Sequence, residues 1–294
     1  LEPCDHYGKT PPCTDEIIKR KIRKVVIAIK DPNEINNGRG VRKLKRNKIS
    51  VKLGVLEKEA NKIYRPYTKF ITEKLPFVTV KIAESLDGKI ATSKGESRWI
   101  SNELSRIYVH KLRSRVDAVM VGINTVLKDN PLLLPRIRSK EVTKRVVVDS
   151  NLKLPLNSQL IRTARIAPLI IATTNKSSKK KRNMLTKKGA LVIVMRSKNS
   201  KIDLQNLFQA LATMDIMHVL VEGGGELIGS LFDEGLVDRI LFFISPKIIG
   251  GETAVTSIGG KGVRRINDAI RLKNMEIKRF REDILVEGNV YRNN

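Results

Sequence analysis

The sequence predicts an α/β protein whose sheet is largely parallel. Short β-branched runs of strand length alternate with amphipathic stretches of helical length along most of the chain. Helices between successive strands provide the crossovers that parallel pairing requires. The last two strand-like runs have no helix between them, which indicates a closing hairpin and a mixed sheet edge. A length of 294 residues is typical of about two domains.

The first 73 residues are predicted to form a small α/β unit. Prolines and glycines make residues 1–13 a loop, and Thr14 then offers a cap for a helix. The run KVVIAI, which Asp31-Pro32 ends, predicts a buried strand. The expected helices are 15–21, 40–48 and 57–69, and the expected strands are 24–29 and 49–53.

A second domain is predicted over residues 76–294. Its strand runs are rich in Val, Ile and Leu, and its helices begin at polar residues such as Ser101. The expected strands are 77–83, 118–122, 145–148, 169–173, 191–194, 218–221 and 239–244, with a hairpin at 276–280 and 283–290. The expected helices are 101–112, 204–214 and 226–234.

Composition excludes several classes of protein. Hydrophobic residues make up 41% of the chain, which is enough for packed cores, and the longest apolar runs have the length of strands. The first residues lack the apolar core of a signal peptide. Both cysteines lie within the first 13 residues, where a metal site is a better explanation than a disulfide framework. We therefore expect a reduced, cytoplasmic protein with no membrane segment.

The formal net charge of +27 leaves two interpretations open. A surface this basic attracts polyanions and could bind nucleic acid. Alternatively, it is a lysine-rich surface on a protein whose ligands carry phosphate. Aromatic residues make up only 4% of the chain, which is poor for base stacking, and the basic runs 39–48 and 179–188 have the character of exposed faces or loops. The second interpretation is favoured, and nucleic acid is an unlikely partner.

Three stretches carry the chemistry. VKIAESLDGKIA, followed by GESRWI, is a strand that runs into a polar turn and a single tryptophan. GINTVLKDNP follows a strand and is expected to bring hydroxyl, amide and carboxylate groups into one loop. VLVEGGGELIGS is a buried strand that ends in glycines and opens a helix. Glycines allow a ligand to approach the backbone, and a helix N-terminus offers N–H groups to phosphate, although a tight turn alone would also explain this pattern.

Together these stretches, with HKLRSR and VVVDS in the same order, resemble the C-terminal reductase of riboflavin biosynthesis from about residue 76 onward. The resemblance implies a fold like that of dihydrofolate reductase. It also implies NADPH-dependent reduction of the ribosyl group of 5-amino-6-(5-phosphoribosylamino)uracil to the ribityl form. A reductase that acts on the diaminopyrimidine before its deamination is the alternative, and a homodimer is possible.

The resemblance also implies which residues bind each ligand. The residues expected at NADPH are Ala83, Trp99, Thr125, Asp129, Ser150, Gly224, Gly225, Glu226, Leu227, Ile228, Gly229 and Ser230. Those expected at the phosphorylated substrate are Arg98, Arg113, Leu133, Arg136 and Glu222. Arginine suits this second role because its guanidinium group can hold phosphate through two hydrogen bonds. The proton donor stays open among Lys81, Asp87 and Asp129.

The opening LEPCDHYGKTPPC resembles the zinc segment of the cytidine-deaminase-like domain that precedes this reductase in the bifunctional deaminase/reductase. The resemblance implies that Cys4 and Cys13 are zinc ligands. The His and Glu of an H-x-E motif, which would complete that site, do not occur in the chain, and His6 is badly spaced to replace them. We therefore expect an N-terminally truncated protein, with residues 1–73 the remnant of a zinc deaminase (hydrolase) domain and reductase activity alone.

Overall fold

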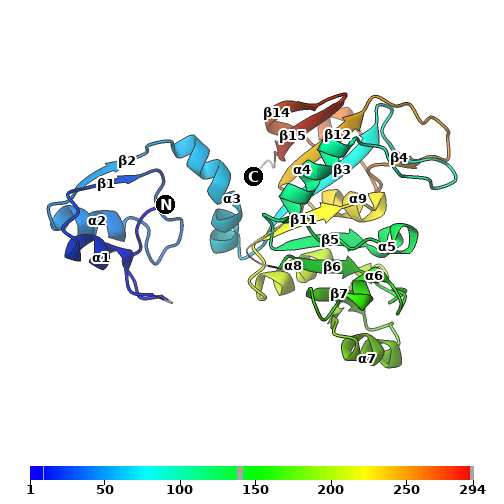
Figure 1. Ribbon diagram of the computed structural model, residues 1–294, viewed down its shortest axis with the longest axis horizontal. Helices are drawn as coiled ribbons and strands as arrows, with labels where there is room; N and C mark the ends of the chain where they lie inside the picture. Colours follow the sequence, from blue (N-terminus) through cyan, green and yellow to red (C-terminus); the bar gives the residue numbers. More distant parts are fainter. Residues whose placement is uncertain (9, 138–141, 292–294) are drawn as a thin grey trace. The chain divides into compact units, whose positions relative to one another are not determined.

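The protein is represented by a computed structural model, which describes residues 1–8, 10–137 and 142–291 (Figure 1). The chain divides into two compact units, Leu1–Phe77 and Val78–Asn294.

The first unit is a two-stranded parallel sheet with three helices. Strands β1 and β2 pair in parallel, with Lys24 opposite Ser50. The carboxylate of Glu2 is 4% exposed and accepts hydrogen bonds from the backbone N–H groups of Gly38 and Val41, so it fastens the first residues to the start of α2. The elements are α1 (Cys13–Lys19), β1 (Lys24–Ile27), α2 (Arg39–Arg46), β2 (Ser50–Leu53) and α3 (Glu57–Glu73).

The second unit contains a nine-stranded mixed sheet in the order β14-β15-β12-β3-β11-β5-β6-β7-β8. Pairing is parallel from β11 through β8 and between β12 and β3, whereas β15 is antiparallel to both β12 and β14. The expected closing hairpin is therefore confirmed. The strands are β3 (Phe77–Ser85), β5 (Ala118–Gly122), β6 (Lys144–Val148), β7 (Leu169–Thr174), β8 (Leu191–Met195), β11 (His218–Glu222), β12 (Arg239–Ser245), β14 (Leu272–Phe280) and β15 (Asp283–Val290).

Helices and short strands connect this sheet. The helices are α4 (Glu103–Arg113), α5 (Ile123–Asp129), α6 (Gln159–Arg162), α7 (Lys179–Lys187), α8 (Leu204–Ala212) and α9 (Gly225–Asp233), with a 3₁₀ turn at Ile266–Asp268. Two short antiparallel pairs complete the unit, and they join β4 (Lys89–Ala91) to β13 (Val255–Thr256) and β9 (Ser197–Lys198) to β10 (Lys201–Ile202).

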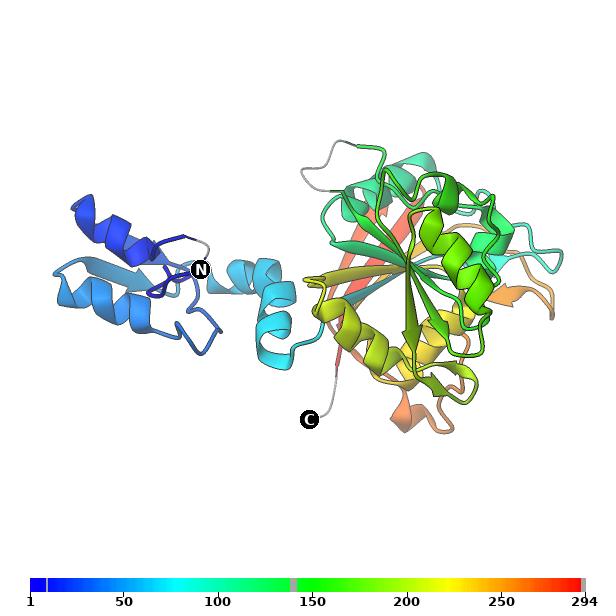
Figure 2. The same ribbon diagram turned by 90° about the horizontal axis from the view of Figure 1, so that it is seen from below.

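The helices cover both faces of the sheet (Figure 2). On one face, α4 packs over β12 and β15, where Val109 joins Leu241, Phe243 and Leu285 in a buried cluster. The same face carries a larger cluster built from β5, β6 and β7 with α6 and α7. Helices α8 and α9 lie on the opposite face (Figure 2). This layering leaves the carboxyl ends of β3, β5 and β11 at one edge, where ligands bind in open α/β sheets.

Local structure differs from expectation in places. Residues 123–129 were expected in a loop but form α5, which ends at Asn130 in a left-handed conformation directly before Pro131. The basic run at 179–188, expected as an exposed face or a loop, includes the largely exposed helix α7, and the Ser178 side chain caps this helix by accepting from the Lys181 N–H. Helix α4 is capped by Asn102, whose side chain accepts from the Ser105 N–H, and so begins two residues after Ser101.

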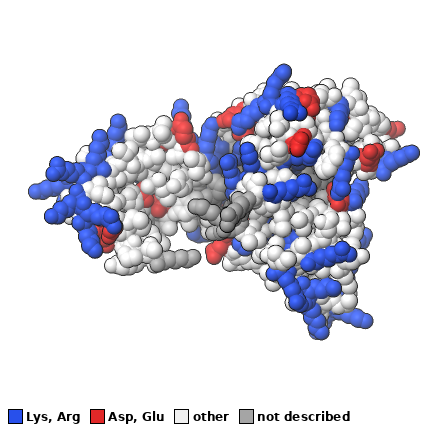
Figure 3. All heavy atoms as spheres, in the orientation of Figure 1, with Lys and Arg blue, Asp and Glu red and all other residues white. Residues whose placement is uncertain are grey.

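On the visible face of both units, lysine and arginine side chains cover much more of the surface than aspartate and glutamate do (Figure 3). Residues 150–202, which include α6, α7 and β8, contain no Asp or Glu at all. Within residues 1–8, 10–137 and 142–291, no helix has the length and apolar composition of a membrane span.

Candidate active site

An ion pair between Arg113 and Glu222 lies at the carboxyl edge of the sheet. Arg113 is the last residue of α4, and Glu222 is the last residue of β11. The guanidinium group donates from Nε to Glu222 Oε1 at 2.7 Å and from Nη2 to Oε2 at 2.8 Å. The two side chains are only 16% and 10% exposed. The two hydrogen bonds fix the orientation of both side chains. Burial by itself raises the pKa of Glu222, but the positive charge of Arg113 outweighs it, and the net pKa is below the usual range.

Lys81 lies on β3 beside this pair. Its ammonium group is 5.8 Å from the centroid of the Phe243 ring. Burial lowers the pKa of Lys81, while the negative charge of Glu222 works in the opposite direction. Ala83, two residues further along β3, packs against the cluster beneath α4 and is paired in register with Phe243. The resemblance placed Ala83 at the cofactor, and Lys81 lies on the same face of β3.

Residues 131–136 are fastened to this site at three points. The Leu133 side chain is 3% exposed and packs into the core, and its backbone is left-handed with φ of 59°. The Leu134 carbonyl accepts from Arg113 Nη1 at 3.3 Å. The Arg136 backbone N–H donates to His110 Nδ1, also at 3.3 Å. Because the Leu133 side chain is inside the core, only its backbone can face a ligand.

A glycine corner lies where β11 enters α9. Gly223 and Gly224 have φ of 77° and 85°, which is the left-handed region that favours glycine. A Cβ atom at either position would come 3.4 Å from Thr125 Oγ1. Thr125 belongs to α5, which begins directly after β5. The corner therefore brings the N-termini of α5 and α9 together, with backbone rather than side chains at the point of approach.

Two other glycines of this run serve packing inside the protein. A Cβ atom at Gly225 would lie 2.8 Å from the Thr256 carbonyl oxygen, and one at Gly229 would lie 2.2 Å from the Gly259 carbonyl carbon. The Gly259 N–H donates to the Gly225 carbonyl at 2.9 Å. Close approach of backbone was expected here, and the chain's own segment 256–260 provides it at these two positions.

The first turn of α9 carries Glu226, which is held by Lys201. The Lys201 ammonium group is 2.6 Å from Glu226 Oε1, and the Asn124 side-chain amide reaches Oε2 at 3.5 Å. Ser150 contacts the residue after Lys201, because its hydroxyl accepts from the Ile202 N–H at 3.3 Å. Residues from α5, β10 and α9 thus meet around Glu226, although the sequence places them far apart. The remaining α9 positions of the expected phosphate segment are Leu227 and Ile228, which are buried, and Ser230, whose hydroxyl donates to the Glu226 carbonyl.

Trp99 is 60% exposed, so it is not part of the core. The Arg106 guanidinium lies 4.4 Å from its ring centroid, and the Lys247 ammonium donates to its carbonyl at 2.7 Å. Arg98 donates to the Asp129 carbonyl at 2.7 Å, and Ser97 reaches the Asp129 carboxylate at 3.5 Å. The GESRW segment is therefore tied to the end of α5 and presents an aromatic face to solvent.

Asp87, one of three expected proton-donor candidates, has a structural task. Its carboxylate accepts from the Ser85 hydroxyl at 2.6 Å and from the backbone N–H groups of Ile249 and Gly250 at 3.0 and 2.7 Å. These bonds lower the pKa of Asp87 to about 2, and the bond from Ser85 has the largest effect. The side chain joins the turn after β3 to the segment after β12, and at neutral pH it carries no proton to donate.

In the first unit, Cys4 and Cys13 are adjacent. The Cys13 N–H donates to Cys4 Sγ at 3.3 Å, and a hydrogen bond with Cys4 raises the pKa of the Cys13 thiol. His6 does not join them, and its Nδ1 is buried without a hydrogen bond. Over the described part of the chain, no three His, Cys, Asp or Glu side chains are grouped closely enough to hold a metal ion. The two thiols therefore fit only part of a zinc site.

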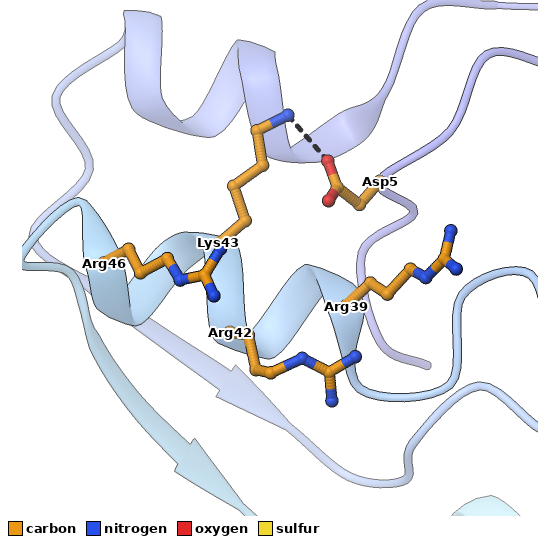
Figure 4. A pocket seen from close by; sticks show the side chains of 5 residues that line it. All are labelled: Asp5, Arg39, Arg42, Lys43 and Arg46. Carbon is orange, nitrogen blue, oxygen red and sulfur yellow. Dashed lines mark hydrogen bonds and ion pairs between the residues drawn. The ribbon is translucent and has the colours of Figure 1, made fainter.

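Beside the Cys4 segment lies a basic hollow, defined by Asp5, Arg39, Arg42, Lys43 and Arg46 (Figure 4). The Lys43 ammonium is 2.6 Å from carboxylate oxygens of both Asp5 and Asp15 and is neutralised by them. The positive charge of the hollow therefore comes from the arginines of α2.

The sequence-based site had two omissions. The sequence analysis assigned no role to His110, yet it lies one turn before Arg113 on the same face of α4. Lys201 was passed over among many basic residues and is identified only by its distance to Glu226. Spacing on a helix could have found the first, whereas the second depends on tertiary contacts.

Comparison with known proteins gives a consistent result. The RibD C-terminal domain matches residues 76–286. The riboflavin biosynthesis protein RibD of Actinobacillus pleuropneumoniae is 40% identical over 98% of this chain and 76% of its own length. That of Aquifex aeolicus is 39% identical over 97% of this chain and 78% of its own length.

Solved structures agree with this. Acinetobacter baumannii RibD, 29% identical, superposes with a TM-score of 0.86 over 99% of this chain and 80% of its own. A Thermotoga maritima protein, described as a diaminohydroxyphosphoribosylaminopyrimidine deaminase/5-amino-6-(5-phosphoribosylamino)uracil reductase, is 34% identical with a TM-score of 0.82 over 99% of this chain and 78% of its own. The chain belongs to the RibD family of riboflavin biosynthesis proteins.

Proposed function

We propose that this chain reduces the ribosyl group of 5-amino-6-(5-phosphoribosylamino)uracil to the ribityl form, with NADPH as the reductant. The observation that carries the proposal is the buried Arg113–Glu222 pair at the carboxyl edge of the sheet, next to the Gly223–Gly224 corner. The Thermotoga relative, whose name includes this reductase activity, supports the choice of substrate.

The substrate is held by charge and by hydrogen bonds. Arg136 supplies a cation for the phosphate group, and Arg113 supplies a second whose orientation Glu222 fixes. Glu222 accepts hydrogen bonds from sugar hydroxyl or pyrimidine N–H groups through the lone pairs that Arg113 leaves available. The Arg113 and Glu222 side chains are largely buried, so little solvent screens them and their electrostatic contacts with a substrate would be strong.

The glycine corner fits a dinucleotide phosphate. A Cβ atom at Gly223 or Gly224 would fill the approach to Thr125, and the two helix N-termini offer backbone N–H groups at the same place. Thr125, Gly224 and Ser150 would hold the cofactor there, with the Trp99 ring available for stacking. When bound, NADPH supplies the hydride, and the protein's task is to align the donor and acceptor carbons and exclude water.

The reduction also consumes a proton, because opening of the ribose ring turns its oxygen into a hydroxyl group. Among the three candidates, we assign this proton to Lys81. Asp87 is fully ionised at neutral pH and bound by three donors. Asp129 lies at the far end of α5 with its backbone tied to Arg98. Lys81 lies beside Glu222, and the lowering of its pKa by burial eases release of a proton.

The test is the consumption of NADPH by the purified chain with two substrates in parallel. We expect turnover with the deaminated compound and at least tenfold lower kcat/KM with the diaminopyrimidine. Lys81→Met should lose most of kcat with little change in KM, whereas the matched exposed variant Lys111→Met should behave like the wild type. Faster turnover of the diaminopyrimidine would favour the alternative reductase, and no turnover of either compound would refute the proposal.

We also propose that residues 1–73 correspond to the C-terminal part of a zinc deaminase domain, with Cys4 and Cys13 as two ligands. The adjacency of the two sulfur atoms supports this, as does the deaminase named in the Thermotoga relative. Because a tight site needs a third protein ligand, we expect less than stoichiometric zinc by elemental analysis. One tightly held zinc ion per chain would contradict that expectation. A homodimer also remains a proposal, which light scattering can test.

A further inference from the structure

The segment 131–136 reaches the substrate site through bonds to α4. Two of its backbone groups are held by side chains one turn apart on that helix. The Leu134 carbonyl accepts from Arg113, and the Arg136 N–H donates to His110 Nδ1. The bond at His110 is adjacent to the side chain of Arg136, which the proposed function uses for the phosphate group.

The chemistry of this contact fixes the state of the imidazole. A backbone N–H can only donate, so Nδ1 must be the unprotonated nitrogen and the ring proton must be on Nε2. A doubly protonated ring could not accept the bond. Burial, followed by the positive charges of Arg113 and Arg136, lowers the pKa of His110, while Glu222 and the Leu134 backbone oppose this. Lys81 acts on Glu222 as a further positive charge.

We propose that neutral His110 is a positioning residue, which holds the backbone at Arg136 so that the Arg136 side chain meets the substrate phosphate. The inference rests on the proposed function for the identity of that substrate. His110 itself touches the segment 131–136 and takes no part in the transfer of hydride or proton. Loss of this contact should therefore change KM rather than kcat.

The pH dependence follows from this geometry. Since the folded pKa of His110 is below its ordinary value of 6.5, the ring is neutral at pH 7 and the Arg136 bond is intact. As the pH falls through this lowered pKa, the ring gains a proton at Nδ1 and the bond is lost. The KM for the phosphorylated substrate should therefore rise toward acid pH.

Substitutions at His110 separate this role from general packing. Asparagine can place its carbonyl oxygen near the position of Nδ1 but does not titrate. We expect His110→Asn to keep KM within about twofold of wild type at pH 7 and to remove the acid rise in KM. His110→Ala should raise KM about fivefold at pH 7, as expected for one lost hydrogen bond, with kcat changed less than twofold. Lys111→Ala, exposed on the same helix, is the control and should match the wild type.

Hydrogen exchange at the Arg136 amide gives a readout that does not need activity. The protection factor should be high in the wild type and in His110→Asn, and low in His110→Ala. In the wild type alone it should fall as the pH decreases through the lowered pKa of His110, which is below 6.5. The inference is wrong if His110→Asn loses amide protection and raises KM as His110→Ala does. It is also wrong if wild-type protection is absent at all pH values. A chain with the expected protection pattern but no turnover would refute the proposed function instead.

Discussion

Arg113 and Glu222 form a buried ion pair at the end of α4. Substituting one or both residues separates the effect of the pair on stability from its effect on activity. Glu222→Leu leaves the Arg113 guanidinium buried without its partner, and we expect a loss of about 3–5 kcal/mol in the free energy of unfolding. The double variant Arg113→Met/Glu222→Leu should regain most of that stability, because no unpaired charge remains, while activity stays lost. Urea unfolding and NADPH consumption measure the two effects. A double variant less stable than Glu222→Leu would contradict this account.

His218 predicts a specific weakness toward acid. Burial, then the positive charge of Arg239, lowers its pKa to about 4, and its Nε2 is 2.8 Å from the Thr79 hydroxyl. Between pH 6.5 and 4 the unfolded chain binds more protons at this residue than the folded chain does. Stability is therefore full above pH 6.5 and declines as the pH falls toward 4, by at most about 3 kcal/mol for this group.

The measurement is urea unfolding across that pH range for the wild type and His218→Gln. Glutamine keeps a polar group near Thr79 but does not titrate. The wild type should lose more stability than the variant as the pH decreases, and parallel curves would show that His218 does not titrate as proposed.

Among single residues, sequence motifs predicted Arg113 and Glu222 separately as substrate-binding residues. They could not show that the two side chains bind each other, since 109 positions separate them and only the packing of α4 on β11 joins them. Helix spacing could have placed His110 beside Arg113, but its bond to the Arg136 N–H could not be predicted, because that partner is a backbone group of a segment outside the helix.

Among the secondary-structure elements, helix α9 packs closely against segment 256–260 because Gly229 has no side chain. A methyl group at Gly229 would lie 2.2 Å from Gly259, so segment 256–260 would have to move. We expect Gly229→Ala to lower the free energy of unfolding by about 1–3 kcal/mol. Ser230→Ala, the next residue of the same helix, removes only a bond to the Glu226 carbonyl and should cost less than about 0.5 kcal/mol. Thermal unfolding of both variants measures the difference, and equal stabilities would contradict the close contact.

Periodicity predicted most strands and helices of the sheet, since apolar runs and their polar ends are local signals. It failed at the short helices α5 and α7, because each buries few apolar side chains. In α7 the first turn carries lysines only, which the helix dipole disfavours, and the sequence predicted no more than an exposed face or a loop there. The glycine run was read as an approach to ligand, but segment 256–260 accounts for Gly225 and Gly229.

At the scale of the whole molecule, the charge of +27 does not require a nucleic-acid function. Aromatic residues make up 4% of the chain, so contact with nucleic acid would rest on phosphates and would weaken steeply with salt. We expect a random DNA or RNA duplex to bind no tighter than about 1 μM at physiological salt, as measured by fluorescence anisotropy. Submicromolar binding there would make nucleic acid a partner in its own right.

In the proposed reaction, hydride passes directly from NADPH to the ribosyl carbon at the edge of the nine-stranded sheet. The measurement is a reaction of the chain with 5-amino-6-(5-phosphoribosylamino)uracil and NADPH deuterated at C4, followed by mass spectrometry and NMR of the product. We expect a ribityl product with one deuterium at C1′, formed in equal amount to the NADP⁺. NADPH oxidation without a ribityl product, or a ribityl product without deuterium from either face of the cofactor, would contradict it.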